Sequence, residues 1–173
     1  MQIKIIKISI ISIFVFLIGV FFMGLNKDSI YDTKGLEGQK LKNIKLEHFK
    51  KDKVISDKEL MNNNFTLINF WASWCRPCRI EHKYLLKLSK NNSSLKLLGI
   101  NFKDKKENAL KFLLELGDPY YLIASDIDGR SSVQFGVYGI PETIIIDKNL
   151  KIIKKIIGPI NESDYKDILR IIK

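Results

Sequence analysis

Two cysteines, Cys75 and Cys78, are separated by two residues in the segment Trp74-Cys75-Arg76-Pro77-Cys78. An apolar run that predicts a buried strand precedes the segment, and a helical pattern follows it. A C-x-x-C pair at a helix N-terminus places the first sulfur beside the unpaired N–H groups of the first helical turn, which favour the thiolate. We therefore expect Cys75 to be a redox nucleophile. Cys78, one turn into the helix and more buried, is expected to resolve the mixed disulfide.

The residues around the cysteines agree with this chemistry. Arg76 adds a positive charge beside Cys75, which further favours the thiolate. Pro77 lacks an N–H at a position where the first turn of a helix does not need one. Trp74 is expected to contribute packing, whether or not it also frames the sulfur.

Other uses of a cysteine pair fit the sequence less well. A structural disulfide that closes so short a loop would remove little chain entropy. Covalent haem attachment needs a histidine directly after the second cysteine, where this chain has Arg79. The two cysteines and the scattered His48 and His82 make a poor four-ligand zinc site. A thiol peroxidase would need a Thr/Pro-rich context that is missing. Thiol–disulfide exchange without a metal or other cofactor is the predicted chemistry.

An uncharged apolar stretch lies at residues 8–26. At about 1.5 Å per helical residue it is about 28 Å long, which matches the hydrocarbon core of a bilayer. A cleaved secretory signal is the alternative, but the stretch is long for one and no small-x-small cleavage pattern follows. We expect an uncleaved transmembrane anchor, with the basic tail at residues 1–7 in the cytoplasm and everything from residue 27 exported.

The exported part has the pattern of an α/β domain. Residues 27–43 are polar, contain two glycines and indicate a linker, and the domain is expected to cover residues 44–173. Its strand and helix patterns alternate and end with a two-strand hairpin and a helix, which predicts a central mixed sheet with helices on both faces. The main expected strands are 44–49, 65–71, 95–102, 120–124, 143–147 and 150–157, and the main expected helices begin near residues 78, 105 and 162.

The net charge of +10 permits a nucleic acid or an anionic membrane surface as a partner. Lysines supply most of the positive charge and are spread along the chain among acidic residues, with Lys50-Lys51-Asp52-Lys53 as the densest run. No basic stripe interleaved with aromatic residues marks a nucleic-acid surface. We therefore expect solvated faces and no nucleic-acid partner.

Several segments resemble known families. Trp74-Cys75-x-x-Cys78 after a buried strand resembles the thioredoxin superfamily, and Gly139-Ile140-Pro141 resembles its cis-proline loop, which faces the active-site sulfur. The chain resembles more closely, over about residues 44–160, the membrane-anchored thiol–disulfide oxidoreductases of cytochrome c maturation, the CcmG/DsbE family. The segments that carry this closer resemblance are Trp71-Ala72-Ser73-Trp74-Cys75, Cys78-Arg79-Ile80-Glu81-His82, Gly99-Ile100-Asn101-Phe102-Lys103-Asp104, Leu116-Gly117-Asp118-Pro119-Tyr120 and Gly136-Val137-Tyr138-Gly139-Ile140-Pro141-Glu142-Thr143.

The resemblance implies a thioredoxin-like fold and a periplasmic dithiol that reduces the disulfide of the C-x-x-C-H haem-binding motif in apocytochromes c. It also implies a single-pass anchor in the bacterial inner membrane, electrons from a membrane thiol–disulfide transporter, and the cytochrome c maturation machinery as partner. The soluble domain is expected to be a monomer. Two alternatives stay open: a broader exported reductase, for example for copper-site assembly proteins, and a non-catalytic module that binds an apocytochrome.

One position departs from the ordinary thioredoxin pattern. Thioredoxins usually have a buried Asp six residues before the nucleophile, which handles the proton of the resolving thiol, whereas this chain has Asn69. The resemblance offers Glu81 and Glu142 as substitute acids, and Pro141 as the cis-proline opposite the thiols. A solvated surface position is the alternative for each glutamate, and His82 is expected on the helix surface.

Overall fold

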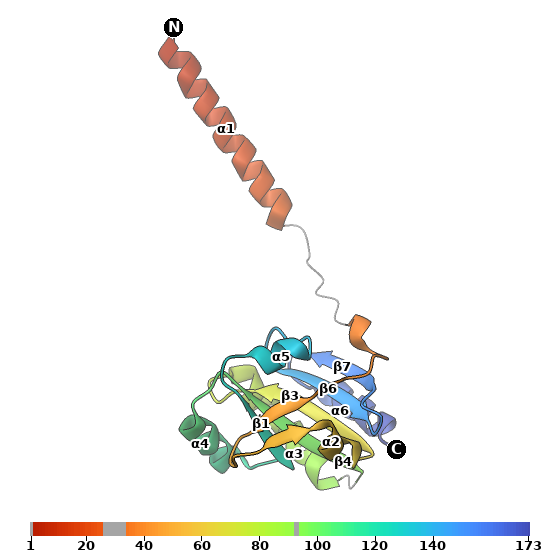
Figure 1. Ribbon diagram of the computed structural model, residues 1–173. Coiled ribbons are helices and arrows are strands. Elements are labelled where there is room, and N and C mark those ends of the chain that lie inside the picture. The colour runs from red at the N-terminus through yellow and green to blue at the C-terminus, as the bar shows by residue number, and fades with distance from the viewer. Residues whose placement is uncertain (1, 26–33, 92–93) are drawn as a thin grey trace. The chain divides into compact units, whose positions relative to one another are not determined.

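The computed structural model describes residues 2–25, 34–91 and 94–173. The chain divides into an N-terminal unit that ends at residue 32 and a C-terminal unit that begins at residue 33. The N-terminal unit contains helix α1 (Gln2–Leu25), drawn in red in Figure 1. Within it, Ile5–Gly24 has a mean hydropathy of 2.7 and none of its surface is buried. Its length and composition allow this helix to cross a bilayer, as an anchor or a signal sequence does.

A mixed sheet of seven strands forms the centre of the second unit, in the order β2-β1-β5-β4-β3-β6-β7. The central strands β3, β4 and β5 run parallel to one another, and every other pair of neighbours is antiparallel. The strands are β1 (Lys45–His48), β2 (Val54–Ser56), β3 (Phe65–Trp71), β4 (Leu95–Phe102), β5 (Leu122–Asp126), β6 (Glu142–Asp147) and β7 (Ile152–Ile157).

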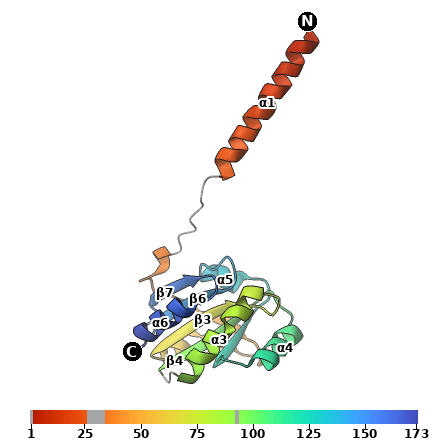
Figure 2. The ribbon, with the colours of Figure 1, turned by 180° about the vertical axis from the view of Figure 1, so that it is seen from behind.

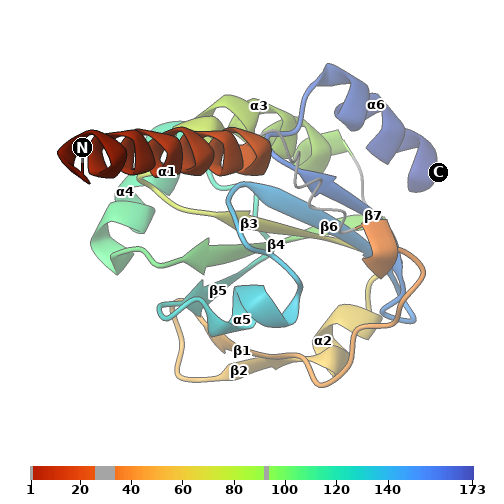
Figure 3. The same ribbon diagram turned by 90° about the horizontal axis from the view of Figure 1, so that it is seen from above.

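Helices cover both faces of the sheet. They are α2 (Asp57–Met61), α3 (Arg76–Asn91), α4 (Lys106–Leu116), α5 (Arg130–Gln134) and α6 (Glu162–Ile171). Leu67 of β3 packs with residues of α3 and α6, and Trp71 packs with residues of α4. The intervening Ile68 packs with Leu60 of α2 and with Phe135 beside α5. Since successive side chains of a strand point to opposite faces, α3, α4 and α6 lie on one face and α2 and α5 on the other, as Figure 3 shows. Figure 2 shows the face covered by α3, α4 and α6.

The thioredoxin-like α/β fold is confirmed, and its central elements lie where the sequence predicts them. Strands β3 and β4 have the expected bounds. Both are buried on their two faces, so each has a nearly continuous apolar run that marks its limits. Strand β5 begins two residues later than expected, because Tyr120 lies in a turn in which its N–H donates to Asp118 Oδ1 at 3.0 Å.

The N-terminal boundary of the domain differs from the expected residue 44. The short helix η1 (Lys34–Leu36) and the residues after it pack along β7, where Gly38 N donates to Ile152 O at 2.8 Å. The side chains of Leu36 and Leu41 pack against the core. The described part of the expected linker therefore belongs to the folded domain, and its first residues lie outside the described residues. Its polar, glycine-containing pattern hides this, because a segment at a sheet edge buries few side chains.

Candidate active site

Cys75 and Cys78 form a disulfide at the start of α3, with an S–S distance of 2.02 Å. Their residues are 4% and 2% exposed. Helix α3 begins at Arg76, so Cys75 directly precedes its first turn, and the N–H of Cys78 points to Cys75 Sγ at 3.2 Å. An N–H group of the first turn thus faces the sulfur that becomes a thiolate on reduction, which favours the charged form.

The loop before Cys75 is held by the turn that follows β4. Asp104 accepts hydrogen bonds from the backbone N of Ser73 at 2.6 Å and from its Oγ at 2.8 Å. Trp74 Nε1 donates to the carbonyl oxygen of Lys103 at 3.1 Å, and its ring stays 60% exposed. Asp104 ends one of the segments that resemble the CcmG/DsbE family. No local pattern marks its role, because it is 31 residues from Ser73 in sequence.

Arg76 and Pro77 occupy the first turn of α3, and both are exposed. The guanidinium of Arg76 therefore remains in solvent beside the disulfide. Pro77 occupies a position where its missing N–H costs no helical hydrogen bond. Both residues lie where the sequence predicts them.

A buried carboxyl group lies one helical turn beyond Cys78. Glu81 is 0% exposed, and a separation of three residues places it on the same side of α3 as Cys78. Its Oε1 accepts from Asn69 Nδ2 at 2.8 Å, and its Oε2 accepts from Ile160 N at 2.8 Å. Burial raises the pKa of Glu81 to about 7, although both hydrogen bonds act in the opposite direction. Glu81 can therefore gain or lose a proton near neutral pH.

The amide of Asn69 is oriented by two further residues. Tyr120 Oη donates to Asn69 Oδ1 at 2.8 Å, and Asn69 Nδ2 also donates to Thr143 Oγ1 at 3.1 Å. Burial raises the pKa of Tyr120 well above its usual value, so its hydroxyl stays protonated and remains a donor. Its ring stacks on Trp71 with 5.6 Å between the ring centroids. Asn69 is thereby held with its NH₂ group toward Glu81.

Glu142 is also buried, but its surroundings differ. Its Oε1 accepts from the backbone N–H groups of Tyr138 at 3.3 Å and Gly139 at 3.2 Å. Its Oε2 lies 2.9 Å from Lys155 Nζ. The Ile140–Pro141 peptide bond is cis, as expected. Glu142 therefore holds the loop before Pro141, while Glu81 is the glutamate beside the second cysteine.

The expectation that His82 lies on the helix surface is wrong. His82 is 3% exposed, and its Nε2 lies 2.8 Å from the carbonyl oxygen of Gly117. Its ring meets Phe112 of α4 edge to face, with centroids 5.1 Å apart. Burial lowers the pKa of His82, so the neutral ring is favoured, with Nε2–H donating to Gly117. The expected surface position was wrong because α4 packs over this side of α3.

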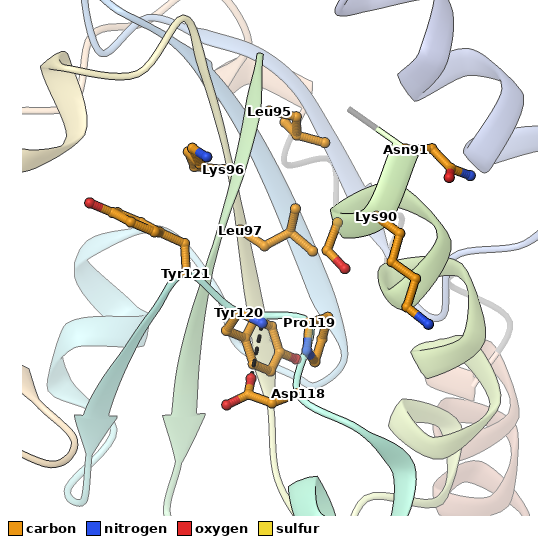
Figure 4. A pocket seen from close by; sticks show the side chains of 10 residues that line it. Lys90, Asn91, Leu95, Lys96, Leu97, Asp118, Pro119, Tyr120 and Tyr121 are labelled. Atoms are coloured by element: carbon orange, nitrogen blue, oxygen red, sulfur yellow. Dashed lines mark hydrogen bonds between the residues drawn. The ribbon is translucent and has the colours of Figure 1, made fainter. Parts of the chain in front are cut away.

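Two surface hollows lie at opposite ends of α3. The one shown in Figure 4 has a volume of about 600 Å³ and lies at the C-terminal end, where Lys90, Lys96 and Tyr121 line it. The other, of about 450 Å³, lies beside Trp74 and is lined also by Lys103 and by the exposed Ile127. Of these two, only the second is lined by a residue of the C-x-x-C segment, Trp74. Among the residues that the structure describes, no group of three or more His, Cys, Asp or Glu could hold a metal ion.

Comparison with known proteins indicates the same chemistry as this site, thiol–disulfide exchange. The sequence model of the Redoxin family matches residues 36–169. The chain belongs to the Redoxin family. This Redoxin is 35% identical to the thiol:disulfide interchange protein HelX of Rhodobacter capsulatus over 127 residues, which are 73% of this chain and 71% of HelX. It is 34% identical to the thiol:disulfide interchange protein DsbE of Vibrio cholerae over 134 residues, which are 78% of this chain and 72% of that protein.

A solved structure is also similar to this Redoxin. A crystal structure from Chlorobium tepidum, proposed to be a thiol:disulfide interchange protein DsbE, has a TM-score of 0.65 and 25% identity, and the match covers 78% of this chain and 93% of that chain. The Redoxin is thus a thiol–disulfide oxidoreductase of the DsbE type, with a C-x-x-C active-site disulfide. The family match begins at residue 36, which agrees with a domain that starts before residue 44.

Proposed function

We propose that this Redoxin is a periplasmic reductase, anchored in a bacterial inner membrane by α1, that reduces the C-x-x-C-H disulfides of apocytochromes c. The observation that carries the proposal is the buried disulfide at the start of α3, together with the segment 136–143, which resembles that of the cytochrome c maturation family. Ile140 of that segment packs against the cluster that contains both cysteines. The soluble domain acts as a monomer.

In the proposed reaction, the Cys75 thiolate attacks one sulfur of the substrate disulfide. A bond forms between Cys75 Sγ and that sulfur, and the other substrate sulfur leaves as a thiolate that takes up a proton. Cys78 then attacks Cys75 Sγ, which restores the Cys75–Cys78 disulfide and releases the second substrate thiol. Two electrons pass from the protein dithiol to the substrate, and a membrane thiol–disulfide transporter supplies two electrons to reduce the protein again.

Glu81 is the proposed base for the second step. The Cys78 thiol must lose its proton before it attacks, and a buried thiol has a raised pKa. A carboxyl group with a pKa of about 7, one helical turn away and buried with Cys78, can accept that proton at neutral pH. Asn69 holds the carboxylate through the hydrogen bond to Oε1.

The substrate approaches over the exposed Trp74 ring. The hollow beside this ring is lined by Trp74, the residue before Cys75, and provides room for a segment of polypeptide. Arg76, exposed on the other side of Cys75, favours the thiolate that starts the reaction. An exposed approach of this kind suits a disulfide carried on a polypeptide better than a small molecule that binds in a buried cleft.

The test is the reaction of the reduced, full-length protein in detergent micelles with a disulfide-bonded C-x-x-C-H peptide. The intact protein is expected to reduce the peptide, Cys75→Ser to be inactive, and Cys78→Ser to accumulate a mixed disulfide with the peptide. Iodoacetamide at pH 6.5 is expected to modify Cys75 before Cys78. If the Cys75→Ser protein still carried out the function of the unmodified protein, that function would not need the cysteine, and the protein would be a binding module. If peptides without the haem-binding motif were reduced equally fast, it would be a broader reductase.

A further inference from the structure

Lys155 is a buried lysine in β7, and its side chain is 1% exposed. An ammonium group is costly to bury unless other groups compensate its charge. Its Nζ lies 2.9 Å from Glu142 Oε2 and donates to the carbonyl oxygen of Gly136 at 2.6 Å. One cation therefore contacts both ends of the segment from residue 136 to residue 142.

Glu142 carries this contact into the middle of the segment. Its second oxygen, Oε1, accepts from the N–H groups of Tyr138 and Gly139 at 3.3 and 3.2 Å. The ammonium thus binds the carboxylate on one side, and the carboxylate binds two successive backbone groups on the other. The next residue, Ile140, packs against the cluster of Cys75 and Cys78. A continuous set of contacts leads from Lys155 to the core cluster that contains both cysteines.

We propose that Lys155 is a positioning residue for the substrate polypeptide. Through Glu142 and the Gly136 carbonyl, it holds the loop 136–141 in the conformation that receives the substrate chain next to Cys75. Lys155 touches no reacting sulfur, and its effect on the reaction is exerted through the loop. The inference rests on the proposed function in one respect, that the protein reduces a disulfide carried on a polypeptide, and it adds that the loop 136–141 receives this polypeptide.

The neighbouring lysine offers a matched comparison. Lys154 lies on the same strand and pairs with Asp167 of α6 at 3.0 Å. This ion pair lies on the other face of β7 from the loop, because successive side chains of a strand point to opposite faces. Loss of Lys154 therefore removes a lysine and an ion pair from β7 without removing a contact to residues 136–142.

The experiment compares Lys155→Met with Lys154→Met in the reduced full-length protein in detergent micelles. Two rates are measured for each: the second-order reaction with a disulfide-bonded C-x-x-C-H peptide, and the alkylation of Cys75 by iodoacetamide, which needs no docked polypeptide. Lys155→Met is expected to slow the peptide reaction at least tenfold and to leave alkylation within twofold of the unmodified protein. Lys154→Met is expected to leave both rates within twofold.

A double variant keeps the inference testable if the single variant is too unstable to assay. Lys155→Met combined with Glu142→Gln leaves no unpaired buried charge. The double variant is expected to show the same selective loss, no larger than that of Lys155→Met alone or of Glu142→Gln alone. Equal slowing of the peptide reaction and alkylation, or a peptide rate within twofold of the unmodified protein, would overturn the positioning role.

The outcomes also separate this inference from the proposed function. Peptides without the haem-binding motif serve as a second substrate. If the unmodified protein reduced them as fast as the C-x-x-C-H peptide, the proposed apocytochrome specificity would be wrong. A selective loss of both peptide reactions in Lys155→Met would still support the positioning role.

Discussion

Asn69 on β3 donates from Nδ2 to Glu81 Oε1 on α3 at 2.8 Å, and both side chains lie in the interior of the domain. The position that carries an acid in the ordinary thioredoxin pattern thus carries a neutral amide here, and the acid lies on the helix instead. The amide binds the carboxylate, so Asn69 orients the acid that we propose as the base for the resolving step.

Glu81→Gln is expected to change how stability depends on pH. The folded pKa of about 7 lies above the ordinary value of 4.5, so the unfolded chain releases the proton at a lower pH than the folded domain does. Glu81 therefore lowers the free energy of unfolding as pH rises from about 4.5 to 7, by about 3 kcal/mol in total. Urea unfolding of the variant and the unmodified protein at pH 4 and pH 8 measures the difference.

The comparison between the two proteins isolates Glu81. The pKa of His82 is lowered by burial, so His82 lowers the free energy of unfolding as pH falls below 6.5, the ordinary pKa of a histidine. This pH dependence is opposite to that of Glu81. His82 is present in both proteins, and its contribution cancels in the difference. The stability of Glu81→Gln relative to the unmodified protein should rise between pH 4 and pH 8. A difference that stays constant with pH would contradict the raised pKa.

Glu81→Gln is also expected to slow the resolving step. An amide cannot accept the proton of Cys78, and the loss of a general base lowers a rate by about 10²-fold or more. In the unmodified protein, release of a peptide from its mixed disulfide with Cys75 should rise with pH through about 7, the pKa of Glu81, and the variant should lack this inflection. Rapid acid quench measures the release. Alkylation of Cys75 serves as the control and should be unaffected, and an unchanged inflection would show that another group accepts the proton.

Asp104→Ala is expected to destabilise the domain by about 1–3 kcal/mol, because it leaves the N–H of Ser73 without its acceptor. The same change removes the acceptor of Ser73 Oγ. Chemical unfolding measures the loss. Glu115→Ala is the matched control, since it removes only the ion pair with Arg79, in which both side chains are exposed, and should cost less than about 1 kcal/mol. Equal effects of the two substitutions would contradict the role of Asp104.

Two truncated chains test the domain boundary. Residues 34–173 should fold and retain thiol–disulfide exchange. Residues 44–173 lack the Leu36 and Leu41 side chains, which pack on the core, and should be less stable by about 2–4 kcal/mol. The shorter chain also exposes the edge of β7, so it should self-associate more readily in size-exclusion chromatography. Equal stability of the two chains would place the start of the domain near residue 44.

The cysteine chemistry, the central strands and the candidate membrane span could be predicted from the sequence. Each depends on neighbours in the chain. A C-x-x-C pair between a strand pattern and a helix pattern places Cys75 at a helix N-terminus wherever the helix later packs. The apolar runs of β3 and β4 mark strands that are covered on both sides, and the uncharged stretch at residues 8–26 marks a span by length alone.

The roles of the two glutamates could not be predicted in this way. Glu81 is beside Cys78 in the sequence, but its partner Ile160 is 79 residues away, and burial by distant elements raises its pKa. Glu142 has the same side chain, yet it is paired with Lys155 of the neighbouring strand. The protonation of a carboxyl group depends on its desolvation and on nearby charges. Elements far apart in the chain supply both, so two glutamates that look alike in sequence acquire different roles only when the domain folds.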